Sequence, residues 1–143
     1  MIPADQLSSA QKKTVAGMQA GSFGVGGPFI ALLREPKLAH QAYAMATYFR
    51  EASGRGPKLT EFVILLAARD WTPQFKWTAH YSRALKLGLT EETVNAIAEG
   101  RRPPNLPNDE ELIYDFWTEL SRNKSVSEAT YERAIQKFGE PGW

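Results

Sequence analysis

His80 stands in the stretch FKWTAH and is one of only two histidines in the chain. Lys76 precedes it by four positions, so on a helix the two side chains are neighbours on one face. Trp77, Ala84 and Leu87 fall at helical intervals from the histidine, which predicts that the imidazole lies on an apolar stripe. An imidazole partly shielded from water can exchange a proton near neutral pH, because nearby charges tune its proton affinity.

A carboxylate is expected close to this histidine. Glu61 opens and Arg69 closes the run EFVILLAAR, whose apolar residues surround the helix and indicate burial on most sides. A short connection joins this helix to the one that carries His80, so the two are expected to pack antiparallel, with Glu61 approaching His80. A carboxylate, an imidazole and the Lys76 ammonium group around an apolar pocket would suit proton transfer.

The same pattern has a structural interpretation, and both interpretations stay open. A Glu61–His80 hydrogen bond could hold two core helices together while Lys76 extends along the surface into solvent. His40, in LAHQAY, has no such neighbours and is interpreted as a structural or surface histidine. Two distant histidines without a cysteine or a His-x-x-x-His pair are poor metal ligands, so neither a metal nor another cofactor is predicted.

Apolar residues with helical spacing, and the residue types that usually start and end helices, occur along the whole chain. Strand patterns are missing. The glycine-rich segment GSFGVGGPF is expected to be an irregular loop, because its spacing fits no phosphate-binding motif. The sequence therefore predicts an all-α, single-domain helical bundle of about eight helices over residues 1–143. The expected helices are roughly 9–18, a short one from Pro28, 36–52, 58–71, 73–87, 91–99, 109–120 and 128–138.

Composition narrows the classes of partner. Seventeen Lys and Arg against sixteen Asp and Glu give a net charge of +1, and the basic residues are scattered, so no nucleic acid is expected. The chain has no cysteine, which excludes disulfides, thiolate metal sites and thiol redox cycles. Its amino end has no signal-peptide pattern and no run of eighteen apolar residues occurs, so we expect a soluble, cytoplasmic protein without membrane contact.

The run LTEFVILLAARDWTPQFKWTAHYSRALKLGLTEETVNAIAEGRRP, continued by DEELIYDFWTEL and SEATYERAIQKFGE, resembles the carboxymuconolactone decarboxylase family. That family shares its all-α fold with alkylhydroperoxidase D, and the likeness covers roughly residues 28–142. The resemblance implies that Glu61 and His80 are the proton-handling pair. Lys76, Trp77 and Arg69 are the residues that we expect to contact the substrate, with Lys76 also taking part in catalysis.

The sequence departs from this family at three places. In the peroxidase branch two cysteines precede the histidine, whereas the matching positions here hold Pro73 and Lys76, so disulfide-based peroxide reduction is not available. In the decarboxylase-like branch the position of Lys76 is often a glutamate, so the charge beside the histidine is reversed here. Relatives usually continue past FGE into a further apolar helix, so the domain is expected to lack the family's final C-terminal helix.

These observations favour a cofactor-free lyase of the decarboxylase type that acts on a small anionic lactone or keto acid by proton transfer. The resemblance also implies a homo-trimer or hexamer. Lys76 could hold the departing carboxylate, and His80 with Glu61 could deliver the proton that quenches the resulting enolate. The alternative is a non-catalytic oligomeric binding or scaffold protein with the same fold, and a third possibility is a peroxidase that needs no thiol.

Overall fold

The computed structural model describes residues 2–21, 24–71 and 74–140, and the side chains of 74–76 lie outside that description. Across these residues the chain forms eight α-helices and one short 3-10 helix, with no strand. The all-α prediction is therefore confirmed. None of the helices in these ranges has the length and the apolar character that crossing a membrane would require.

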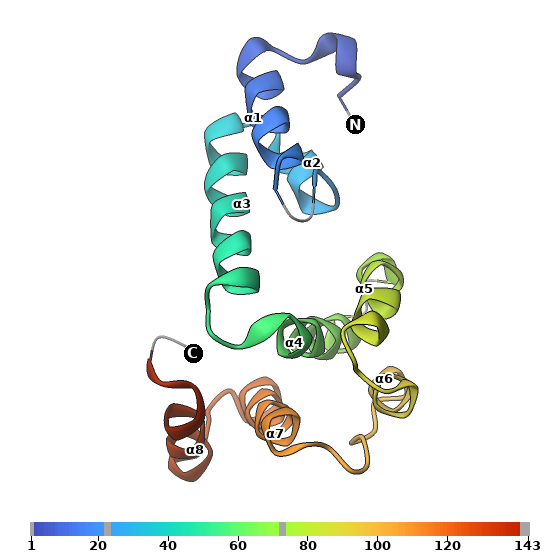
Figure 1. The fold of residues 1–143 in the computed structure, drawn as a ribbon, viewed down its shortest axis with the longest axis vertical. Helices are drawn as coiled ribbons and strands as arrows, with labels where there is room; N and C mark the ends of the chain where they lie inside the picture. Colours follow the sequence, from blue (N-terminus) through green and yellow to red (C-terminus); the bar gives the residue numbers. More distant parts are fainter. Residues whose placement is uncertain (1, 22–23, 72–73, 141–143) are drawn as a thin grey trace. The chain divides into compact units, whose positions relative to one another are not determined.

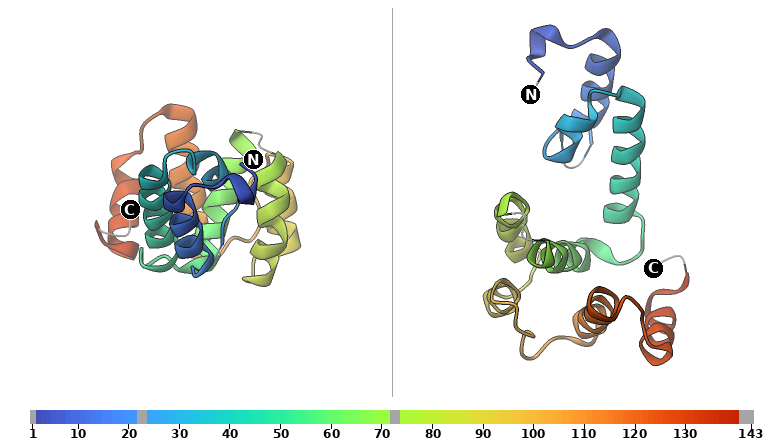
Figure 2. Two further views of the ribbon diagram at one scale, coloured as in Figure 1. Left: turned by 90° about the horizontal axis from the view of Figure 1, so that it is seen from above. Right: turned by 180° about the vertical axis from the view of Figure 1, so that it is seen from behind.

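The chain divides into two compact units, residues 1–50 and 51–143. The succession of helices can be followed in Figure 1 and, from two further directions, in Figure 2. The helices are α1 (Ser9–Gln19), α2 (Pro28–Leu32), α3 (Pro36–Glu51), α4 (Gly56–Asp70), α5 (Gln74–Lys86), α6 (Glu91–Ala98), α7 (Asn108–Asn123) and α8 (Glu128–Phe138).

In the first unit, α1 starts where the sequence predicts. Ser8 is its N-cap: the Ser8 hydroxyl accepts a hydrogen bond from the Gln11 backbone N–H at 3.2 Å, and the Gln11 side chain accepts one from the Ser8 N–H at 2.9 Å. This reciprocal capping box satisfies two N–H groups that a bare helix end would leave unpaired. Pro28 and Pro36 likewise occupy the first positions of α2 and α3.

A small apolar cluster of Met18, Ala39 and Tyr43 forms the core of this unit. The Tyr43 hydroxyl donates a hydrogen bond to the Met18 carbonyl at 2.9 Å. A Cβ at the position of Gly21 would lie 2.3 Å from the Tyr43 hydroxyl oxygen, so a larger residue there would displace the Tyr43 ring. His40 is exposed on α3. Of its two interpretations, a structural or a surface histidine, this position fits the surface one.

In the second unit, α4 is the central helix and packs against α5, α6 and α7 (Figure 1). Its buried residues cover most of its circumference, as its apolar run predicts: Leu59, Thr60, Glu61, Phe62, Leu65, Leu66 and Ala68. The core cluster around it also contains Ala84 from α5, Leu89 from the segment before α6, Val94 and Ile97 from α6, and Ile113 from α7. This packing fixes the face of α5 that is turned toward α4.

The helices of this unit begin and end close to the residues that the sequence marks as helix starts and stops, with small differences. Gly88, Gly100 and Gly139 all have positive φ, the conformation that glycine adopts without a steric penalty after a helix. Helix α4 begins two residues earlier than predicted, because Pro57 fits its first turn. The predicted N-cap and first residue of α5, Thr72 and Pro73, lie outside the described residues.

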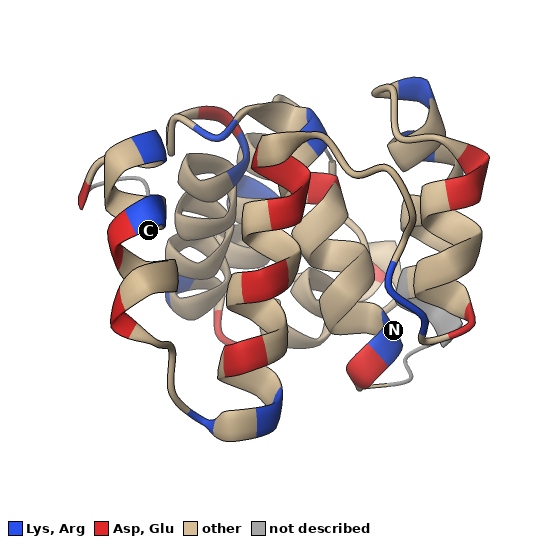
Figure 3. Cartoon of the chain, turned by 90° about the horizontal axis from the view of Figure 1, so that it is seen from below, with Lys and Arg blue, Asp and Glu red and all other residues tan. Residues whose placement is uncertain are grey.

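Helix α7 carries acidic residues along its length and basic residues at its C-terminal end, as Figure 3 shows. Its Glu119 carboxylate also fixes the start of α8. The carboxylate accepts hydrogen bonds from the Ser127 backbone N–H at 2.6 Å, the Ser127 hydroxyl at 3.2 Å and the Thr130 hydroxyl at 2.7 Å. The pKa of Glu119 lies below its usual value of 4.5, first because of the Ser127 N–H bond and then because of the Thr130 bond.

Glu119 should therefore make the α7–α8 contact sensitive to acid. A carboxylate with a lowered pKa in the folded state binds fewer protons than it does in the unfolded chain, so its stabilisation is present above pH 4.5 and is lost as the pH falls toward the folded-state pKa. Glu119→Gln should be less stable than wild type at neutral pH, with a difference that shrinks below pH 4.5. Urea unfolding at several pH values measures this, with Glu132→Gln on α8 as the control. A difference that stays constant down to pH 3 would contradict it.

Candidate active site

The structure brings Glu61 of α4 and His80 of α5 into direct contact. The distance from the His80 Nδ1 atom to the Glu61 Oε2 atom is 2.6 Å, so the predicted approach of these two side chains is confirmed. The Glu61 side chain is 1% exposed and the His80 side chain 15% exposed. The pair therefore joins a fully buried carboxylate to an imidazole that still reaches the surface.

Arg83 is a third member of this group, and the sequence analysis missed it. Its Nε atom lies 3.1 Å from the Glu61 Oε1 atom, the carboxylate oxygen that does not face His80. Arg83 follows His80 by three positions, so the two side chains project from the same face of α5. This three-residue spacing is visible in the sequence and indicates that Arg83 lies near His80. The Arg83 side chain is 41% exposed, so its neighbours cover it only in part.

This geometry assigns roles to the two imidazole nitrogens of His80. An ionised carboxylate only accepts hydrogen bonds, so the Nδ1 atom that faces Glu61 carries the hydrogen. The Nε2 atom is then the one that exchanges a proton with a bound molecule or with water. Glu61 also fixes the orientation of the ring, and Arg83 provides a permanent positive charge beside the carboxylate. The three residues together can hold and move one proton at a defined atom.

Two further predicted site residues lie on the same helix. Trp77 is half-buried and packs against the apolar core cluster of the second unit, one turn before His80. The backbone of Lys76 belongs to α5, but its side chain lies outside the described residues. The roles that the sequence suggests for Lys76 and Trp77 toward a substrate therefore stay predictions.

Arg69, the remaining predicted substrate contact, lies elsewhere. It is two turns after Glu61 on α4, and a Cβ placed on Gly100 would be 3.2 Å from one of its guanidinium nitrogens. Arg69 lines a cavity with Ile97 and Trp117, and neither Glu61 nor His80 lines that cavity. The position of Arg69 in the sequence does not predict this placement. The cavity is formed in part by Gly100, whose position depends on the path of the chain after α6.

A second buried carboxylate occurs in the same unit without a histidine. Glu110 of α7 is almost fully buried, and its Oε1 atom lies 2.5 Å from the Lys58 Nζ atom of α4. This ion pair connects α4 to α7. In the ranges that the structure describes, no three His, Asp or Glu side chains gather as a metal site would require.

A scan of the chain against protein-family models found no match, and searches of the curated proteins and of the solved structures found none either.

Proposed function

We propose that this protein is a cofactor-free lyase of the carboxymuconolactone decarboxylase type, which releases CO₂ from a small anionic lactone or keto acid by using His80 as its proton donor. The observation that supports this most directly is the 2.6 Å contact between the buried Glu61 carboxylate and the His80 Nδ1 atom. A buried carboxylate that orients an imidazole, whose other nitrogen can meet a ligand, is a common arrangement for general acid–base catalysis.

In the proposed reaction, the bond between the substrate's carboxylate and its neighbouring carbon breaks. The electron pair of that bond moves into the conjugated carbonyl group, which gives CO₂ and an enolate. The protonated imidazole of His80 then transfers its Nε2 proton to the enolate carbon, and a proton from water restores the imidazolium. The hydrogen on Nδ1 stays bonded to His80 and is donated to Glu61 throughout the reaction. The negative charge of Glu61 stabilises the positive ring.

A cation near the imidazole is needed to hold the anionic substrate, and α5 offers two. Lys76 is the residue that the sequence suggests for this role, one turn before His80. Arg83 is the second candidate, because its Nε atom bonds to Glu61 while its side chain remains partly exposed. An arginine fixed through Nε presents its two terminal nitrogens in a planar arrangement that suits a carboxylate.

One observation also favours the structural alternative, a binding or scaffold protein without catalysis. His80 and Arg83 both come from α5, and both contact one carboxylate on α4. Such a group would hold the two helices together whether or not a reaction took place. The two proposals differ in one respect: only the enzyme needs the His80 Nε2 atom.

The proposed function is tested by incubating the protein with carboxylated unsaturated lactones and with β-keto acids and measuring CO₂ release. His80→Gln should lower the turnover of any substrate found by about 10²–10⁴-fold, which is the usual contribution of a general acid. Glutamine can still bond to Glu61, so the change in stability should be small compared with the change in rate. Absence of CO₂ release from every compound would refute the lyase, and full activity of the variant would refute His80 as its proton donor.

A further inference from the structure

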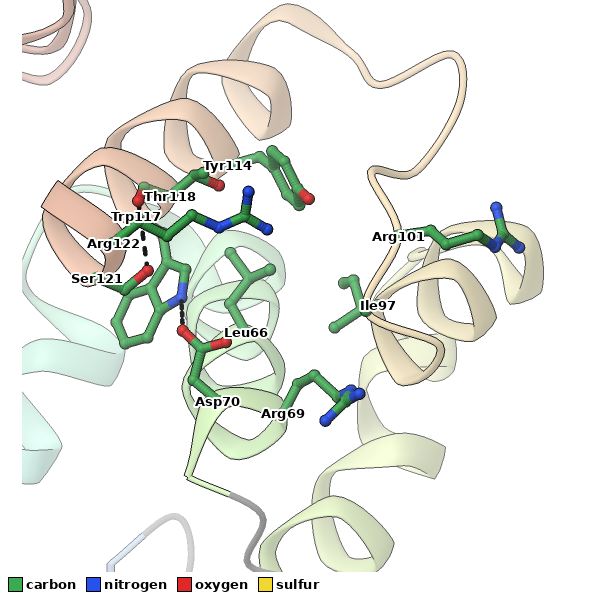
Figure 4. Close-up of a pocket in the computed structure, with 11 residues that line it drawn as sticks. Leu66, Arg69, Asp70, Ile97, Arg101, Tyr114, Trp117, Thr118, Ser121 and Arg122 are labelled. Carbon is green, nitrogen blue, oxygen red and sulfur yellow. Dashed lines mark hydrogen bonds between the residues drawn. The ribbon is translucent and has the colours of Figure 1, made fainter.

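A small cavity and an open groove adjoin each other in the second unit. The cavity has a volume of about 50 Å³ and lies where the end of α4, the segment after α6 and the middle of α7 meet (Figure 4). The groove beside it has a volume of about 520 Å³. Four residues line both of them: Asp70, Trp117, Ser121 and Arg122. Pockets of several hundred Å³ commonly bind small molecules, so one ligand could occupy the groove and extend into the cavity.

Two arginines reach this region without an acidic partner. Within the ranges that the structure describes, Arg69 and Arg122 make no ion pair, whereas Arg101 is paired with Glu99. Figure 4 shows the Arg122 side chain extending toward the other residues that line the cavity, while Arg101 points away from them. A guanidinium group presents several N–H donors in one plane, which matches the two oxygens of a carboxylate.

Aromatic and apolar side chains form the rest of the groove. Trp71 is 80% exposed, and Leu120 is also exposed. The Trp117 ring is held in place, because its indole N–H donates a hydrogen bond to the Asp70 Oδ2 atom at 2.7 Å. An exposed apolar patch of this kind commonly marks a binding site. Flat or aliphatic apolar groups would pack against these two tryptophans.

The charge in the groove favours an anion. Among the residues that line the groove, Arg122 and Lys124 outnumber the single Asp70 carboxylate, although the Lys124 ammonium group also donates to the Ser121 carbonyl. Asp70 repels an anion on its own side of the Trp117 ring, so the negative group of a ligand should lie near Arg122. A nucleic acid would need a longer row of cations than these.

We infer that this groove binds a small organic carboxylate with an apolar body. Arg122 holds the carboxylate, while Trp71, Trp117 and Leu120 contact the body. The inference does not depend on the proposed lyase reaction, because Glu61 and His80 line neither the cavity nor the groove.

Titration with phenylacetate, followed through the indole N–H signals in ¹H–¹⁵N spectra, tests this inference. We expect saturable shifts of the Trp71 and Trp117 signals. The neutral isostere phenylacetamide should bind about tenfold more weakly, and Arg122→Gln should weaken phenylacetate binding to a similar extent, because each removes a charge-assisted hydrogen bond. Trp71→Ala should weaken both compounds.

Two control variants complete the experiment. Arg101→Gln should leave phenylacetate binding nearly unchanged, because Arg101 points away and is paired with Glu99. His80→Gln should also leave it unchanged, so that failure of the lyase proposal and failure of this one are distinguishable. Equal affinity for phenylacetate and phenylacetamide, an affinity that Arg122→Gln does not alter, or the absence of saturable shifts would each overturn the inference.

Discussion

Glu61→Gln is expected to lower the turnover of the proposed lyase by about 10²–10⁴-fold. The amide has one oxygen and one NH₂ group, so it cannot accept hydrogen bonds from both His80 and Arg83 as the carboxylate does. If the NH₂ group turns to His80, the Nδ1 atom must accept and the ring's hydrogen moves to Nε2. The neutral imidazole is then held in the wrong tautomer, and it loses the negative charge that stabilises its protonated form.

Glu110→Gln is the matched control for this change. It also converts a buried carboxylate that pairs with a cation into an amide, in the same unit and against the same central helix. Each variant should lose about 1–3 kcal/mol of unfolding free energy, because each leaves a buried polar group imperfectly paired. Only Glu61→Gln should lose turnover when both are compared well below their melting temperatures.

The comparison also separates a catalytic role of Glu61 from a purely structural one. Equal loss of activity in both variants would mean that loosening of the helices, and not the chemistry of Glu61, lowers the rate. Equal retention of activity would mean that the Glu61–His80 contact only holds α4 and α5 together. Either result would refute the catalytic role proposed for Glu61.

The Glu61–His80 contact was accessible from the sequence because it depends on local rules. The apolar run after Glu61 identifies a central helix, and Gly88 fixes the end of the next helix, so a short connection leaves antiparallel packing as the simple arrangement. Thr90 and Ser127 mark helix starts equally well, since their side-chain oxygens accept from backbone N–H groups three residues later. Caps and helix ends of this kind depend only on residues within one or two helical turns.

The surroundings of Arg122 could not be predicted in this way. The cavity that it lines depends on where the segment after α6 places Gly100 beside Arg69, and on how α7 then crosses α4. Those positions result from the packing of three helices and leave no pattern in the local sequence. Arg83 lies between the two cases: its spacing from His80 was visible, but its bond to Glu61 depends on the rotation of α5 against α4.

Phe62→Ala should have the largest effect on stability. Phe62 follows Glu61 on α4, is fully buried, and belongs to the core cluster that includes Ala84 of α5. Removing a ring from such a site costs the transfer free energy of its atoms plus the cavity that they leave, about 3–5 kcal/mol in total. Domains of this size are usually stable by only about 5–15 kcal/mol. The variant should therefore lose a large part of the stability of the second unit.

Urea unfolding measures this loss, with Tyr131→Ala as the control. Tyr131 is a large aromatic residue on α8 of the same unit, but it is 48% exposed, so its truncation should change stability by less than about 0.5 kcal/mol. Because Phe62 packs in the core between α4 and its neighbours, its loss should also loosen α5 and weaken the Glu61–His80 contact. The His80 ring signals should broaden in NMR spectra of the folded variant. If Phe62→Ala unfolds at the same urea concentration as Tyr131→Ala, α4 is not the central helix of this unit and the site built on it is wrong as well.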